Sequence, residues 1–475
     1  MVKIIYRLFF VFMGLTIVNG AWCFEFCAYG QAKDGSMSIR KKTAYNVILI
    51  SVPCLRFDHL SCYGYSRATT PNIDKFAKKS FLFTQAYSQS TWTLPSMASL
   101  FTSKDVIDHK VFNCETKLAD FELTLAEVLN IFGYKTAAFT SGVHFNKRFN
   151  LHQGFDVYED IPFSTSAVKT GKIGLKLTGK REIKDFFPSI VEWLECNRGE
   201  KFFLFVDIND VHQPFYSPED GDENMFDPEY EGIVDSLYLD SLLKEKMRGD
   251  LIVRDDGEVI KLQKKDVDHI ISHYDAGIYY TDKYFGKLMN ELGNMQLLEN
   301  TIVILTSPHG IDLFDHFTLF HYTHSYPYEE LVHVPLIFFH PSIEASNMRI
   351  KERVQLIDIF PTILECCNIT VPKAIKGVSL FSLIKDGENI DLLNRDIYFT
   401  SAIPSGSDFT WKSTYGVRAL NWKLFMRFSK PHCSVYELYN LDEDPYELNN
   451  LIYEEKDVRT QLIIKLNEWI KNADE

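Results

Sequence analysis

The sequence predicts an α/β fold in which helices cover both faces of a wound, mostly parallel sheet. Short apolar runs rich in β-branched residues alternate with segments of helical periodicity over about 350 residues, which is typical of such sheets. From about residue 396 the pattern changes, because short strand-like segments follow one another without long helices between them. We therefore expect a main α/β domain over 44–395 and a small C-terminal α+β subdomain over 396–475.

The individual elements follow from length and periodicity. Buried strands are expected where apolar runs are short and bounded by turn residues, at 47–50, 81–87, 134–139, 202–207, 302–305 and 334–339. Helices are expected where apolar residues recur every three to four positions, most clearly at 72–79, 123–133 and 264–292. Short strands of the subdomain are expected at 397–400, 415–418 and 423–427. Polar or charged segments at 160–185 and 216–262 are interpreted as insertions.

Composition excludes one class of partner. The chain has 475 residues, and its hydrophobic content of 46% is ample for a large core. Its 50 Lys and Arg residues against 64 Asp and Glu residues give a net charge of −14. A nucleic-acid-binding protein needs a basic surface, so we expect no nucleic-acid partner.

The first residues carry a processing signal. Lys3 and Arg7 precede and flank an apolar run that ends at Val18, followed by small residues. This pattern predicts a secretory signal peptide over 1–21, followed by a linker over 22–43. The run is shorter than the roughly 20 residues that span a bilayer, although an uncleaved membrane anchor stays open as an alternative. We expect a secreted or periplasmic protein with no stable membrane span after signal removal.

Three groups of residues directly follow predicted strands. Pro53 and Cys54 come after the first strand, 210–212 after the fourth, and Pro308 and His309 after the fifth. Ligands of wound α/β sheets bind beyond the carboxyl ends of the strands. We therefore expect these groups to converge on one site.

Several sequence blocks, taken in order, resemble the sulfatase family of the alkaline phosphatase superfamily. They are NVILISVPCLRFDHL at 46–60, DVHQPFY at 210–216, YDAGIYYTD at 274–282, TIVILTSPHG at 301–310, HVPLI at 333–337, DIFPT at 358–362 and ELYNLDEDPYELNNL at 437–451. The resemblance implies an alkaline-phosphatase-like, mixed but mostly parallel sheet sandwiched by helices. It also implies hydrolysis of sulfuric, or phosphoric, esters.

The metal ligands that the resemblance implies are largely missing. Sulfatases hold a divalent cation with an acidic residue at position 53, often a second at 54, and an Asp-His or Asp-Asn pair at 308–309. This chain has Pro53, Cys54, Pro308 and His309 there. Proline has no side-chain ligand atom, and a hard cation prefers several carboxylate oxygens. His309 and, more weakly, Cys54 are the metal-ligand candidates, with a small buried residue as the alternative for Cys54.

The nucleophile position also departs from the family. Sulfatases carry a Cys or Ser that is oxidised to formylglycine, followed by an arginine, whereas this chain has Thr93 and Met97. Threonine cannot yield the aldehyde, but a hydroxyl can attack an ester when it is activated. Thr93 is therefore either the catalytic nucleophile or a structural hydroxyl at a helix start.

Other candidates surround this position. By resemblance His212 is a catalytic and substrate-binding candidate, and His324 and Ser141 are substrate-binding candidates. The cluster Asp312, Asp315 and His316 is either a substitute metal site or a solvated acidic loop, and the second interpretation is favoured. Arg56 is expected to pair with Asp58.

Two functional hypotheses follow. The first is an exported pseudoenzyme, a sulfatase-family protein that has lost its catalytic activity and binds anionic or sulfated ligands, such as a sulfated or phosphorylated small molecule or glycan. The second is an active sulfate or phosphate ester hydrolase, or a phospho-group transferase, that uses Thr93 with a rebuilt metal site. Ca²⁺ or another divalent cation is expected only in the second case.

Overall fold

The computed structural model describes residues 44–472 apart from gaps at 162–180, 213–223, 235–245, 249–250, 254–258, 317–325, 388, 393, 406–409 and 431–432. The predicted signal peptide and linker lie outside the described residues.

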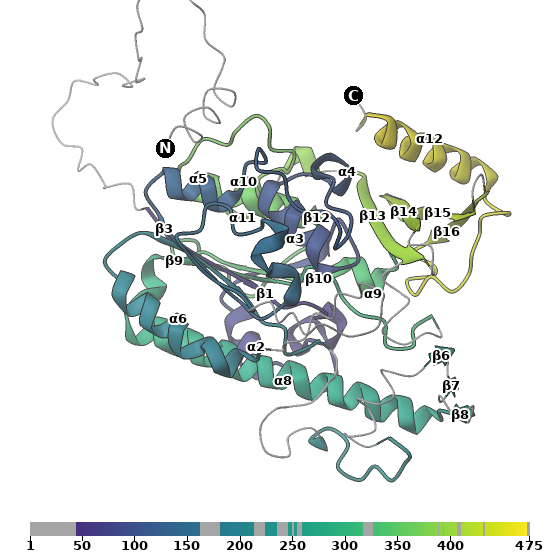
Figure 1. Ribbon diagram of the computed structural model, residues 1–475, viewed down its shortest axis with the longest axis horizontal. Coiled ribbons are helices and arrows are strands. Elements are labelled where there is room, and N and C mark those ends of the chain that lie inside the picture. The colour runs from purple at the N-terminus through teal and green to yellow at the C-terminus, as the bar shows by residue number, and fades with distance from the viewer. Residues whose placement is uncertain are drawn as a thin grey trace, which may run out of the picture.

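A nine-stranded sheet forms the centre of the main domain (Figure 1). Strand β10 is antiparallel to its neighbours β2 and β9, and every other pairing described in this sheet is parallel. The strand order is β11-β2-β10-β9-β1-β5-β3-β4, with β12 also beside β2. This confirms the mixed, mostly parallel sheet. The strands are β1 (Asn46–Ser51), β2 (Phe81–Tyr87), β3 (Lys135–Thr140), β4 (Val157–Glu159), β5 (Phe202–Asp207), β9 (Thr301–Thr306), β10 (His333–Phe339), β11 (Met348–Ile350) and β12 (Val354–Gln355).

Helices cover both faces of this sheet, so the central strands are apolar on both sides. In β1, Val47 and Leu49 pack into one hydrophobic core, while Ile48 and Ile50 pack into the other. The first core contains α3 (Thr93–Thr102), α5 (Leu125–Ile131), α10 (Ile359–Cys366) and α11 (Phe381–Asp386). The second contains α2 (Pro71–Ala77), α6 (Ile183–Asn197) and α8 (Lys264–Asn294).

The described part of the predicted insertion at 216–262 contains a small antiparallel sheet. Its three strands are β6 (Lys246–Arg248), β7 (Leu251–Val253) and β8 (Val259–Lys261). The main domain also contains two four-residue helices, α4 (Val106–His109) and α9 (Glu329–Val332). None of the described helices is long and apolar enough to cross a membrane.

The C-terminal subdomain is a four-stranded antiparallel sheet covered by one helix (Figure 1). Its core joins Val417 and Leu424 of the sheet to Leu462 and Leu466 of the helix. An α+β subdomain at this end of the chain is thereby confirmed. Its elements are β13 (Ile397–Ser405), β14 (Thr410–Ala419), β15 (Trp422–Lys430), β16 (Cys433–Asn440) and α12 (Lys456–Asn472).

A buried ion-pair group joins the subdomain to the main domain. The Nζ atom of Lys423, on β15, lies 3.0 Å from Oε1 of Glu329 and 3.0 Å from Oε1 of Glu447, and the Lys423 side chain is fully buried. Arg418, on β14, lies 2.8 Å from the other carboxylate oxygen of Glu329. These two cations hold the pKa of Glu329 well below its usual range.

Candidate functional site

Three strand ends meet at one edge of the central sheet. Strands β9, β1 and β5 are adjacent and parallel, with Ser51 paired to Thr306 on one side and to Asp207 on the other. The segments that follow them therefore leave the sheet side by side, at the edge where such folds bind ligands. The three strand ends lie together as expected, and the convergence of 53–54, 210–212 and 308–309 on one ligand stays a prediction.

Thr93 and His309 are in contact at this edge. Thr93 is the first residue of α3, and its Oγ1 lies 3.0 Å from Nε2 of His309; both residues are buried. The other ring nitrogen of His309, Nδ1, lies 2.7 Å from the carbonyl oxygen of Gly310. A carbonyl can only accept, so Nδ1 carries a proton; when the ring is neutral, Nε2 then accepts from the Thr93 hydroxyl. This is the geometry of an alcohol paired with a base.

Three positions where the family has charged side chains are apolar in this protein. Met97, one turn further along α3, is fully buried, and its sulfur lies 3.7 Å from the hydroxyl of Ser51. Pro53 and Pro308 are buried as well. The positions expected to carry charge thus present a thioether and two pyrrolidine rings.

Cys54 adopts a left-handed backbone conformation, with φ of 66°, and is buried. Its carbonyl accepts a hydrogen bond from the hydroxyl of Tyr274, on α8, at 2.7 Å. Burial, and to a smaller extent the nearby carboxyl of Asp207, raise the pKa of the Cys54 thiol. Cys54 is therefore a protonated thiol at neutral pH, a form that does not bind metal until it loses its proton.

Asp207 is a site residue that the sequence did not reveal. It ends β5 fully buried, and its carboxyl accepts from the backbone amide of Gly142 at 3.1 Å. Burial raises the pKa of Asp207 well above its usual range. The one available signal was a carboxyl at the end of an otherwise apolar strand.

The predicted substrate-side residues lie in different situations. The hydroxyl of Ser141 donates to the carbonyl of Asp207 at 2.9 Å and accepts from the amide of Asn209 at 2.7 Å, so it joins the ends of β3 and β5. His212 follows β5 and is partly exposed. His324 lies outside the described residues. Their roles in binding stay predictions.

The loop after His309 corrects one expectation. The interpretation of this segment as a solvated acidic loop is wrong for Asp312, because that residue is fully buried. Asp315 lies 2.5 Å from Arg56, which also pairs with Asp58 at 2.7 Å, as expected for those two. His316 lies 2.8 Å from Glu330, which raises the pKa of His316 to about 9.

Comparison with known proteins agrees with this architecture, which is that of the alkaline phosphatase superfamily. The sulfatase family model matches residues 45–369, and a model of the C-terminal region of N-sulphoglucosamine sulphohydrolase matches residues 319–474. The chain therefore belongs to the sulfatase family.

Curated relatives match along most of the chain. An arylsulfatase of Clostridium perfringens is 24% identical over 86% of this chain and 91% of its own length. Human iduronate 2-sulfatase is 25% identical over 86% and 91%, respectively.

Solved structures share the fold. A protein solved in complex with its substrate, D-glucosamine-2-N,6-O-disulfate, superposes with a TM-score of 0.73 at 19% identity, covering 91% of this chain and 98% of that one. The phosphonate monoester hydrolase of Agrobacterium radiobacter superposes with a TM-score of 0.71 at 19% identity, covering 90% and 96%.

The divalent cation that sulfatases generally use does not fit the residues present here. Pro53 and Pro308 offer no side-chain ligand atom, and the two ring nitrogens of His309 face Thr93 and a carbonyl. In the described part of the chain, no three His, Cys, Asp or Glu side chains are grouped so that they could hold a metal. A hard cation needs several oxygen ligands, so we derive no chemical step through a metal.

Proposed function

We propose that this protein is an exported member of the sulfatase family that has lost metal-dependent ester hydrolysis and retains a binding site for sulfated or otherwise anionic ligands. The observation that carries this proposal is the pair of buried prolines at positions 53 and 308, which directly follow β1 and β9, where the family has acidic metal ligands. The protein that was solved with a disulfated glucosamine has a similar fold and binds a ligand of this class.

The remaining groups suit anion binding better than catalysis. The site keeps His309, His212 and the amino-terminal end of α3, which carries a partial positive charge. Imidazoles gain a proton near pH 6.5, so ligand binding is proposed to strengthen as the pH falls through that range. The ligand class is a sulfated or phosphorylated small molecule or glycan.

The purified protein is expected to hold no stoichiometric Ca²⁺, Mg²⁺, Mn²⁺ or Zn²⁺ at this site, because position 309 offers one nitrogen and the prolines none. Elemental analysis after dialysis, together with thermal-shift titration of each ion, measures this. One tightly held ion per chain that is lost in His309→Ala would overturn the proposal.

Turnover of aryl sulfates and bis-aryl phosphates is expected at background, with Thr93 unmodified in peptide mass spectrometry. The reason is that the Thr93 side chain cannot be oxidised to the formylglycine aldehyde, and no cation is available to activate its hydroxyl. The Thr93→Ala variant is the control, since it removes the hydroxyl and leaves α3 intact. Activity in the parent protein that disappears in Thr93→Ala would contradict a pseudoenzyme.

The second candidate function, ester hydrolysis or phospho-group transfer through Thr93, has one observation in its favour. The 3.0 Å contact allows the Thr93 hydroxyl proton to pass to Nε2 of His309 as Oγ1 attacks sulfur or phosphorus. The imidazolium would then return that proton to the leaving alkoxide. Neither a cation nor an arginine at position 97 neutralises the anionic oxygens of such an ester, which favours the first function. A pH–rate profile lost equally in Thr93→Ala and His309→Ala would favour the second.

A further inference from the structure

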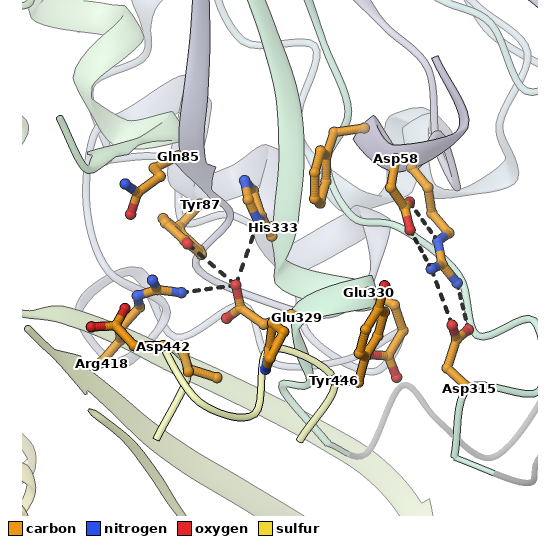
Figure 2. A pocket seen from close by; sticks show the side chains of 14 residues that line it. Asp58, Gln85, Tyr87, Asp315, Glu329, Glu330, His333, Arg418, Asp442 and Tyr446 are labelled. Carbon is orange, nitrogen blue, oxygen red and sulfur yellow. Dashed lines mark hydrogen bonds and ion pairs between the residues drawn. The ribbon is translucent and has the colours of Figure 1, made fainter. Parts of the chain in front are cut away.

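A cavity of about 440 Å³ lies between the main domain and the C-terminal subdomain (Figure 2). It is bordered by the 3₁₀ helix η1 (Phe57–His59), the end of β2, α9, the start of β10, β14 and the loop after β16. Neither Thr93 nor His309 lines it. Its volume is within the range of small-molecule binding sites.

One wall of the cavity is an ion-pair group in which every nitrogen of the Arg56 guanidinium already donates a hydrogen bond. The guanidinium of Arg56 donates to Asp58 at 2.7 Å, to Asp315 at 3.1 Å and to the carbonyl of Ile311 at 3.2 Å. Two carboxylates share one guanidinium, so this wall keeps a negative charge and spare acceptor capacity. It can accept hydrogen bonds from a ligand but has no donor to offer.

The opposite wall carries a donor without a partner. Arg418 binds Glu329, which also accepts from the hydroxyl of Tyr87 at 3.2 Å. The side chain of Arg418 lines the cavity and is 10% exposed, yet its Nε has no hydrogen-bond partner among the described residues. A buried donor left unpaired costs about 1–3 kcal/mol, so an acceptor from a ligand would stabilise this wall.

The loop after β16 adds a platform and a second acceptor. Tyr446 is 68% exposed, although it lines the cavity, and in the view of Figure 2 it lies between the two ion-pair groups. Asp442 is exposed, and no described residue bonds to its carboxylate. An exposed tyrosine ring beside a polar cavity offers an apolar face to a ligand with both apolar and polar sides.

We propose that this cavity binds an unsulfated sugar residue of a glycan chain. A sugar ring carries hydroxyls that donate to Asp442 and to the Asp58–Asp315 wall, hydroxyl oxygens that accept from Arg418, and an apolar face for Tyr446. A sulfate or phosphate group is disfavoured, because five carboxylates and only two arginines line the cavity. The inference rests on the proposed function in one respect, that the ligand is a glycan.

The test measures binding of the full-length protein to an array of neutral, sulfated and amino-sugar oligosaccharides, and then affinities in solution for those that bind. Tyr446→Ala and Asp442→Asn are the test variants, since both side chains are exposed and the fold does not depend on them. Tyr453→Ala is the matched control, because Tyr453 is 79% exposed in the same subdomain but does not line the cavity. At least one neutral oligosaccharide should bind, roughly tenfold more weakly in Tyr446→Ala and unchanged in Tyr453→Ala.

Several results would overturn the inference. One is that no neutral oligosaccharide binds in a manner that depends on Tyr446. Another is that Tyr446→Ala weakens the binding of sulfated oligosaccharides only. A third is that it weakens only the binding of spermidine, which is measured as a cationic probe without hydroxyls. Failure of the proposed function gives a different result from failure of this inference. In that case sulfated ligands do not bind, or bind equally well to His309→Ala, regardless of the effect of Tyr446→Ala on neutral oligosaccharides.

Discussion

Replacing Lys423 with methionine is expected to lower the free energy of unfolding by about 3–5 kcal/mol, because it leaves the buried Glu447 without a cation and Glu329 with Arg418 alone. Lys423 contacts both Glu329 and Glu447, and all of these side chains are largely or fully buried at the junction between the main domain and the subdomain. Methionine has a similar length and fills the space, so the loss comes from charge and not from a cavity. Urea unfolding followed by circular dichroism measures it.

Two further variants make this result specific. Lys471→Met changes an exposed lysine of α12 and should alter stability by less than about 0.5 kcal/mol. Adding Glu447→Gln to Lys423→Met removes one of the stranded carboxylates and should recover part of the loss, which a double-mutant cycle quantifies. Equal stability of Lys423→Met and Lys471→Met would show that the buried pair does not hold the two parts together.

The sequence could not predict this ion-pair group. Its members lie at positions 329, 418, 423 and 447, and nothing local to any of them indicates a partner far along the chain. Lys423 is the second residue of β15, and a lysine is ordinarily solvated. Only the packing of β15 against α9 brings it into the interior.

Strand positions were more predictable than strand directions. The bounds of β2 and β5 agree with those expected, because both are short runs of mostly apolar residues followed by polar residues. The antiparallel direction of β10 was not predictable, since a buried strand has the same composition in either orientation. Strand β16 was not expected either, because its residues (Cys433–Asn440) overlap a motif that was interpreted only as a tail.

The candidate site was predictable in its composition but not in its contacts. Pro53 and Pro308 are visible in the sequence as departures from family motifs. The contact between Thr93 and His309 depends on how α3 is placed against the end of β9, which no local pattern fixes. The raised pKa of Asp207 likewise depends on burial among the ends of three different strands.

The combined variant Pro53→Asp, Cys54→Asp and Pro308→Asp is expected to regain binding of a divalent cation. The three positions follow β1 and β9, which are adjacent and parallel, so the new carboxylates would lie close together beside His309. Position 54 has a φ of 66°, a conformation that aspartate adopts more readily than most residues. Several carboxylates at one point provide the oxygen ligands that Ca²⁺ requires.

Without metal the three carboxylates repel one another in a buried place, so the variant should be less stable than the parent protein. Ca²⁺ at a concentration of about 100 times its Kd should then add roughly 2.7 kcal/mol, seen as a rise of several degrees in Tm. The parent protein should show no such rise. The matched control is Pro53→Asn, Cys54→Asn and Pro308→Asn, which has the same shape without the charge. If the aspartate variant folds by circular dichroism but its Tm ignores Ca²⁺, these strand ends do not form the family's cation site, and the loss of chemistry must lie elsewhere than in the two prolines.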